Sequence, residues 1–139
     1  MTGASCGIDT LRFYPIAGAV PPTTVVVKPY EGAHALELPA IHLAMQTASL
    51  EICVHGQFDP FPEGTNYPAE NLQVSFYNHR RECGSLLYRD VCTVAMWLME
   101  LATSPGTIRE NRFFILVGGT LRGWGTMELT SLRDGVAVA

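Results

Sequence analysis

The sequence carries few charges and almost no lysine. Only 16% of its 139 residues are charged, the formal net charge is −4, and Lys28 is the single lysine beside eight arginines. A protein that binds nucleic acid through its phosphates needs a basic stripe or patch, and this sequence has none. We therefore expect no nucleic-acid partner. The low density of charge also leaves room for an apolar surface patch or for a homodimer.

The sequence also lacks long apolar runs. None approaches the ~20 residues that a membrane-spanning helix needs, so we expect no membrane span. Residues 1–6 have neither the basic start nor the apolar core of a signal peptide, so we do not expect one here. The protein is then either intracellular or secreted with a signal peptide that is absent from this chain. We lean to the second interpretation.

The cysteines show none of the spacings of a zinc site. Cys6, Cys53, Cys83 and Cys92 form no CxxC pair and no cysteine–histidine set, so we expect no metal. An even number permits two disulfides, with three connectivities that the sequence does not distinguish. Free buried thiols at Cys53 and Cys92 are the competing interpretation, with at least equal weight. For Cys83, a disulfide with Cys6 or a structural role is favoured over a reactive thiol.

Signatures of enzymes and cofactor sites are scarce as well. The sequence contains no HExxH metalloprotease motif. The glycine-rich residues 118–125 superficially resemble a phosphate-binding loop, but they join two predicted strands and precede no predicted helix. These glycines fit a tight hairpin with a bulge. We expect no cofactor.

What the sequence does contain is two segments with period-two alternation, 50–57 and 71–79, the pattern of half-buried strands. The first alternates apolar residues with the polar set Glu51, Cys53, His55 and Gln57. The second alternates apolar residues with Gln73, Ser75, Tyr77 and His79. Paired as a hairpin through a bulge or a shifted register, they give one apolar face and one face rich in ionisable and aromatic groups. A last strand would extend the polar face with Trp124, Thr126 and Glu128.

The other segments complete an α+β pattern. Residues 23–28 and 112–117 are rich in β-branched or aromatic residues, which is typical of strands covered on both faces. Helices are predicted from about Pro39 to Ser49, with a further strand as the alternative, and from a cap at Ser85 to residues 105–106. Residues 1–22 form an irregular arm with one edge strand, residues 124–130 a last strand, and residues 134–139 a tail.

This order predicts a single domain, residues 1–139, with an α+β fold of the ferredoxin-like split β-α-β sandwich type. Its antiparallel sheet carries two helices on one face and gains an extra C-terminal strand. The other face of the sheet is open to solvent, a ligand or a second subunit. The architecture, with few lysines and an even number of cysteines, resembles small secreted fungal effector and killer-toxin-like α+β proteins. The resemblance is one of shape and assigns no residues.

Two functions follow, and both use the polar sheet face. In the first, a non-enzymatic, effector-like or self-associating module binds a protein or small-molecule ligand through this face and an aromatic loop. Its expected binding residues are Phe58, Asp59, Phe61, Tyr67, Gln73 and Trp124. In the alternative, the protein is a cofactor-free hydrolase, isomerase or cyclase, because histidine titrates near neutrality and can act as a general base. That site would use His55 as the base, assisted by Glu51, Tyr77 and His79.

Overall fold

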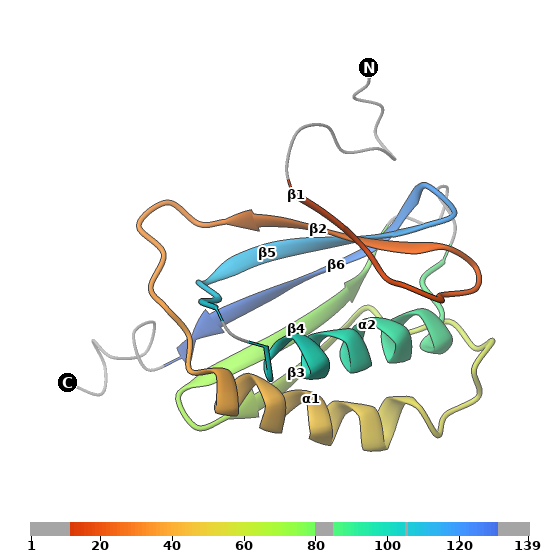
Figure 1. The fold of residues 1–139 in the computed structure, drawn as a ribbon. Helices are drawn as coiled ribbons and strands as arrows, with labels where there is room; N and C mark the ends of the chain where they lie inside the picture. The colour runs from red at the N-terminus through yellow and green to blue at the C-terminus, as the bar shows by residue number, and fades with distance from the viewer. Residues whose placement is uncertain (1–11, 80–84, 105, 131–139) are drawn as a thin grey trace.

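The computed structural model describes residues 12–79, 85–104 and 106–130, which form a six-stranded antiparallel sheet and two helices. Both helices lie on the same face of the sheet (Figure 1). The elements are β1 (Arg12–Pro15), β2 (Thr23–Pro29), α1 (Leu38–Ile52), β3 (Gly64–Ala69), β4 (Leu72–Asn78), α2 (Tyr88–Leu101), β5 (Asn111–Val117) and β6 (Thr120–Leu129). The predicted α+β class, with two helices on one face, is confirmed.

The strands follow the order β1-β2-β5-β6-β4-β3, and every neighbouring pair is antiparallel. The elements from β2 to β5 alternate as predicted, consistent with a ferredoxin-like type of sandwich. The extra C-terminal strand, β6, lies inside the sheet between β5 and β4. It pairs with β5 through a tight turn at Gly118 and Gly119, whose φ angles of 61° and 84° favour glycine. The predicted edge strand of the arm is β1.

The segment 50–57 is not a strand. Helix α1 instead extends to Ile52. Its apolar stripe continues from Ile41 and Met45 to Ile52, and all three are fully buried. Leu50 and Val54, in contrast, are 71% and 80% exposed. The alternation of residues 50–54 therefore belongs to the last turn of a helix and the turn after it, where neighbours in sequence point in different directions. The helix predicted over residues 39–49 is confirmed and extends further.

The strand that pairs with β4 is β3, which lies within residues 58–70, the aromatic loop predicted between the two alternating segments. A two-residue turn, 70–71, joins the two strands, and Tyr67 lies opposite Val74. Gly64 and Pro68 are typical turn residues, which hid this strand in the sequence. Pro68 is tolerated because β3 is the edge strand of the sheet. The predicted bulged hairpin between 50–57 and 71–79 is therefore wrong.

Helix α2 packs an apolar stripe into the core. Val91, Val94, Ala95 and Leu98 are buried. The helix begins at Tyr88, so the predicted cap at Ser85 is wrong. The Leu87 N–H instead donates to the carboxylate of Asp90, at 3.0 Å.

The core between helices and sheet contains a cluster of aromatic rings. Phe76 and Phe113 are fully buried and meet edge to face, with centroids 5.7 Å apart. Gly125 lies beside Phe113 on the neighbouring strand, and a Cβ at this position would lie 2.3 Å from the Phe113 ring. A glycine is therefore needed on β6 to make room for the ring.

Candidate functional site

The open face of the sheet, opposite the helices, carries the polar residues of β4 and β6. The register aligns Gln73 with Glu128, Ser75 with Thr126, and Tyr77 with Trp124. The residues between them in sequence, such as Val74, Phe76 and Met127, are buried in the core. The prediction that the second alternating segment and the last strand share one polar face is confirmed.

Tyr77 and Trp124 form the centre of a row of stacked groups across four strands. Their ring centroids are 4.3 Å apart and their planes differ by 23°. The guanidinium of Arg112, on β5, lies 4.9 Å from the Trp124 ring. On the other side of Tyr77, β3 contributes Gly64, where a Cβ would lie 2.7 Å from the Tyr77 ring. We call Gly64, Tyr77, Trp124 and Arg112 the aromatic row.

A pair of basic side chains continues the aromatic row. Lys28 of β2 lies opposite Arg112 in the register, and both side chains are exposed. Neither takes part in an ion pair with a carboxylate of the described residues. Like charges directly opposite each other on a sheet repel, so an acidic group of a ligand would be attracted to this position.

A shallow groove of about 510 Å³ lies beside the aromatic row. Tyr77 and Trp124 line one part of it, and the rest is formed by Pro60, Phe61, Pro62, Glu63, Asn78, His79 and Ser85. Asn78 fixes the loop at this groove: its amide nitrogen donates to the carbonyl of Phe61 at 2.5 Å, and its amide oxygen accepts the N–H of Leu86 at 2.8 Å. The predicted loop and the polar face therefore meet here.

Two of the three aromatics of the predicted binding loop are buried and do not form a binding surface. Phe61 is 3% exposed and Tyr67 is 6% exposed, and both pack in the core. The Tyr67 hydroxyl donates to the carboxylate of Glu51 at 2.6 Å. Burial and then this hydrogen bond raise the pKa of Tyr67 above its usual range. The hydrogen bond between Tyr67 of β3 and Glu51 of α1 links the helix to the sheet.

His55, Phe58 and Asp59 lie in the loop after α1, on the helix side of the molecule. The His55 ring stacks on Tyr88 with centroids 3.7 Å apart, and its Nδ1 is 3.6 Å from a carboxylate oxygen of Asp59. Phe58 is 73% exposed, and the Arg89 guanidinium lies 5.1 Å from the centre of its ring. Of the predicted loop aromatics, only Phe58 is exposed.

The predicted acid–base residues are not brought together. Tyr77 is on the open face of the sheet, whereas His55 contacts α2 on the other face and Glu51 bonds to the helix-facing Tyr67. His79 pairs its backbone N–H with the carbonyl of Arg122, and its Nε2 is buried without a hydrogen-bond partner among the described residues. The expectation that Glu51, Cys53, His55 and Gln57 share a sheet face with Tyr77 is wrong, because residues 50–57 are not in the sheet.

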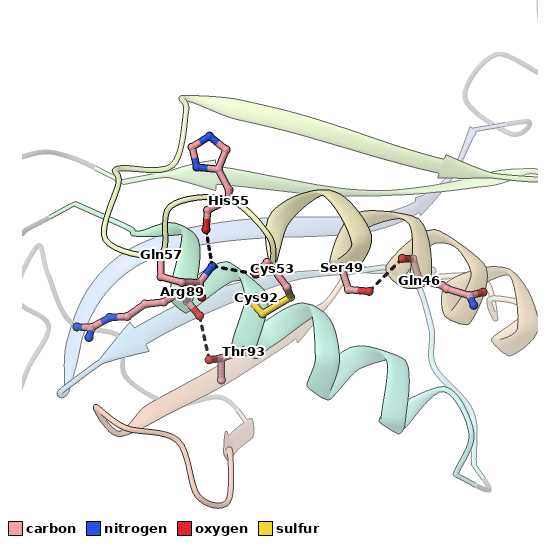
Figure 2. The surroundings of a disulfide bond; sticks show 8 residues. All are labelled: Gln46, Ser49, Cys53, His55, Gln57, Arg89, Cys92 and Thr93. Carbon is pink, nitrogen blue, oxygen red and sulfur yellow. Dashed lines mark hydrogen bonds between the residues drawn. A yellow bond between two sulfur atoms is a disulfide. The ribbon is translucent and has the colours of Figure 1, made fainter.

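A disulfide joins Cys53, at the end of α1, to Cys92 in α2 (Figure 2). The side-chain amide of Gln57 donates to the carbonyls of Cys53 and His55, which closes the turn after α1 over this bridge. Of the two interpretations of these cysteines, the structure has the disulfide. Cys6 and Cys83 lie outside the described residues.

Lys28, Gly64 and Arg112 also belong to the polar face, although the sequence pattern did not predict it. Residues 112–117 were interpreted as a strand covered on both faces. One face is indeed in the core, but the other carries the exposed Arg112 beside a small apolar cluster of Val26, Leu116 and Leu121. The alternation of Arg112 with Phe113 was the signal that could have indicated an open face.

Within the described ranges, no helix has the length and apolarity needed to cross a membrane. In the same part of the chain, no three histidine, cysteine or acidic residues are grouped so that they could hold a metal ion. Comparisons with protein-family models, with curated proteins and with solved structures found no match.

Proposed function

We propose that this is a non-enzymatic binding protein that captures a partner protein through the open face of its sheet. The observation that carries the proposal is the aromatic row, in which Tyr77, Trp124 and Arg112 are stacked beside a groove. Tryptophan, tyrosine and arginine are the residues most enriched at the energetic centres of protein interfaces. Stacking holds these side chains in place before binding, so less conformational entropy is lost when a partner docks.

The row suits a protein partner better than a flat small molecule. Trp124 has Tyr77 stacked on it from β4 and the Arg112 guanidinium over its ring from β5. Tyr77 in turn lies against the backbone of Gly64. The ring faces are therefore engaged within the row, and a partner would meet ring edges and the N–H donors of Arg112. Together with Lys28, these donors favour a partner segment that combines a carboxylate with an apolar side chain.

The alternative, a cofactor-free enzyme, gains no support from the geometry. Its proposed base, His55, is distant in the fold from Tyr77, and its assisting carboxylate, Glu51, already accepts the hydroxyl of Tyr67. The disulfide between Cys53 and Cys92 supports the expectation of a secreted protein, because disulfides persist mainly in oxidising compartments.

The test is selection of a random peptide library on the immobilised protein, followed by affinity measurement on the selected peptides. We expect peptides in which aspartate or glutamate occurs near an aromatic or aliphatic residue, with affinity that falls as salt is added. Trp124→Ala should weaken binding at least about 30-fold, as expected for a residue at the centre of an interface. Arg112→Lys should weaken it less, because the charge remains while the stacking and the planar donors are lost.

Phe58→Ala is the matched control, since Phe58 belongs to the other exposed arginine–aromatic pair, with Arg89. It should leave the affinity unchanged within about twofold. If Phe58→Ala abolishes binding while Trp124→Ala has no effect, the loop and not the sheet face is the binding surface. Selected peptides without acidic residues would contradict the assigned role of Lys28 and Arg112.

A further inference from the structure

We propose that two copies of this chain form a symmetric dimer through the outer edge of β3 and the outer side of α1. The two β3 strands pair antiparallel and join the two sheets into one, while the two α1 helices pack together above the junction. This contact leaves the open face of the sheet and the aromatic row uncovered. The inference therefore does not depend on the proposed function.

Backbone groups of β3 are available to a further strand, because β3 is the last strand of the sheet. The Asn78 N–H donates to the Glu63 carbonyl at 3.1 Å, which makes these two residues a hydrogen-bonded pair of the antiparallel ladder. Such pairs alternate with unbonded ones, so Gly64, Asn66 and Pro68 turn their backbone groups away from β4. No described residue bonds to the outward backbone groups of Gly64 or Asn66. Gly64 is exposed and has no side chain, so the surface that it exposes is backbone.

The edge of β3 also has little of the usual protection against pairing. Free edges are generally blocked by charged side chains, by proline or by a covering segment. The residues of β3, GTNYPA, carry no charge, and the single proline, Pro68, leaves Gly64 and Asn66 able to donate. When Gly64 of one copy lies opposite Asn66 of the partner subunit, every outward N–H and C=O of these two residues is paired in both copies. The same register places Thr65 opposite Thr65 of the partner subunit.

Helix α1 is apolar on its outer side as well as on its buried side. Leu43, Leu50 and Val54 are between 46% and 80% exposed, and with Thr47 they recur at spacings of four, three and four residues. This is the heptad spacing of helices that pack against each other. The helix has no lysine or arginine, and its single carboxylate, Glu51, already accepts a hydroxyl from β3. A helix that is apolar all round is typically covered on every side. We call Leu43, Thr47, Leu50 and Val54 the outer stripe.

The outer stripe and the edge of β3 lie on the same side of the molecule. Helix α1 packs over β3 and β4, with α2 on its inner side (Figure 1). On the inner side, Cys53 at the end of α1 is bonded to α2. On the opposite side of α1, Glu51 accepts the Tyr67 hydroxyl from β3. Thr47 and Val54 are one helical turn from Glu51, so the outer stripe is next to the edge strand and away from α2.

A two-fold axis at the edge of β3 brings both features together. Neighbouring strands are about 4.8 Å apart, so a helix centred over β3 and β4 is roughly 10 Å from its symmetry mate, close to the usual spacing of packed helices. A stable dimer involves about 20–30 residues per copy, and the six residues of β3 are too few alone. The outer stripe adds the apolar surface that the strand pair lacks.

The occupant is a second copy because this surface is complementary to itself. A two-fold contact brings the same patch of both subunits together, so a patch of one charge would repel its mate. The outer stripe carries no charge, and the outward donors and acceptors of Gly64 and Asn66 match those of the second copy.

The first experiment is sedimentation equilibrium of the full chain over a range of concentrations. We expect the mass of two chains, with dissociation into single chains on dilution. Leu50→Glu, in the middle of the outer stripe, should raise the dissociation constant at least about 30-fold, because it brings two like charges into an apolar contact. Met96→Glu is the matched control, since Met96 is an exposed apolar residue of α2, and it should leave the constant unchanged within about twofold. A single chain at every concentration, or a dimer that Leu50→Glu does not weaken, would overturn the proposal.

The second experiment tests the backbone pairing of β3 by comparing Asn66→Pro with Asn66→Ala. Both variants lose the hydrogen bond from the Ser75 hydroxyl to the Asn66 side chain, but only proline removes the outward N–H. Proline is tolerated at such a position of an edge strand, so the single chain should still fold. Asn66→Pro should weaken the dimer at least about tenfold relative to Asn66→Ala, because each copy loses a donor. Equal dimerisation of the two variants would show that the strands do not pair.

Cross-linking then tests the register. Two opposed residues of an unbonded pair have Cα atoms about 4.5 Å apart, within the range of a disulfide, so Thr65→Cys should give a covalent dimer under mild oxidation. Asn66→Cys and the unmodified chain are the controls and should give none. Covalent dimer from Asn66→Cys and not from Thr65→Cys would overturn the pairing of Gly64 with Asn66. Circular dichroism checks the fold of each variant, and if Asn66→Pro does not fold, Thr65→Cys still decides whether the strands pair.

Discussion

Replacing both Cys53 and Cys92 with serine should lower the free energy of unfolding by about 4 kcal/mol. The disulfide ties the end of α1 to α2, so without it the two helices are held together only by packing and by the connecting chain. In the folded protein these contacts remain in place. The main effect is on the unfolded chain, which gains conformations when the link is removed.

The magnitude follows from the length of the closed loop. The two cysteines are 39 residues apart in sequence. Closing a loop of this length removes about 13 cal/mol/K of entropy from the unfolded chain, or about 4 kcal/mol at 25 °C. Domains of this size have a total stability of about 5–15 kcal/mol, so the loss is a large share of it. The melting temperature should fall by roughly 14 °C.

The assay is urea unfolding at 25 °C, followed by tryptophan fluorescence and by far-ultraviolet circular dichroism. Thiol alkylation with mass measurement first establishes that the bridge is closed in the unmodified protein. The single variant Cys53→Ser is the control, because it opens the same loop and should lose nearly the same stability. The dependence on urea should become slightly steeper in both variants, since the unfolded chain is less compact.

A loss below about 1 kcal/mol, with the bridge shown to be closed beforehand, would refute this reasoning. It would mean that the unfolded chain is already compact around these two residues, so that the link restricts it little. A loss much above about 5 kcal/mol would indicate instead that the folded contact between the helices depends on the bridge.

Three further predictions concern charges and the core. Burial, the largest effect, raises the pKa of Asp90 above its usual 3.8, although the N–H of Leu87 acts in the opposite direction. The charged form of Asp90 is therefore disfavoured in the folded state. In urea titrations at several pH values, the unmodified protein should become more stable relative to Asp90→Asn as the pH falls toward about 3.8. Burial also acts on Glu110, but hydrogen bonds, first from the Leu129 N–H, lower its pKa below the usual 4.5. Glu110→Gln should therefore cost about 1–2 kcal/mol at pH 7, and the difference should shrink as the pH falls below 4.5. Gly125→Ala should cost about 1–3 kcal/mol in thermal unfolding, because its Cβ would lie 2.3 Å from Phe113 and from the Ser75 carbonyl.

The parts of the fold that the sequence predicted well are those with a long or unambiguous period. The apolar stripe of α2 and the alternation in β4 and β6 each repeat several times, so the buried face follows directly from the residues. The predicted α+β arrangement followed from their order. The strand predicted for residues 50–57 was wrong because Ile52 fits both the helical stripe from Ile41 and a short alternating run. Only the longer, helical stripe is buried.

The candidate site was predictable only in part. Tyr77 and Trp124 were placed on one face by their alternation, and the structure pairs them directly. Nothing in the sequence places Arg112 or Lys28 beside them, because that depends on which strand pairs with which. The pocket lined by Trp97 and Asn111 is formed by α2, four strands and residues 107–109, and no local sequence pattern predicts it.

The sequence alone thus determined which side chains face the core within each well-patterned element, because side-chain direction is fixed by the local backbone period. Only the tertiary structure decided which of those elements lie next to one another. It inserted β6 between β5 and β4, which sets Arg112, Trp124 and Tyr77 side by side. Such non-local contacts depend on the packing of the whole chain, and no short stretch of sequence specifies them.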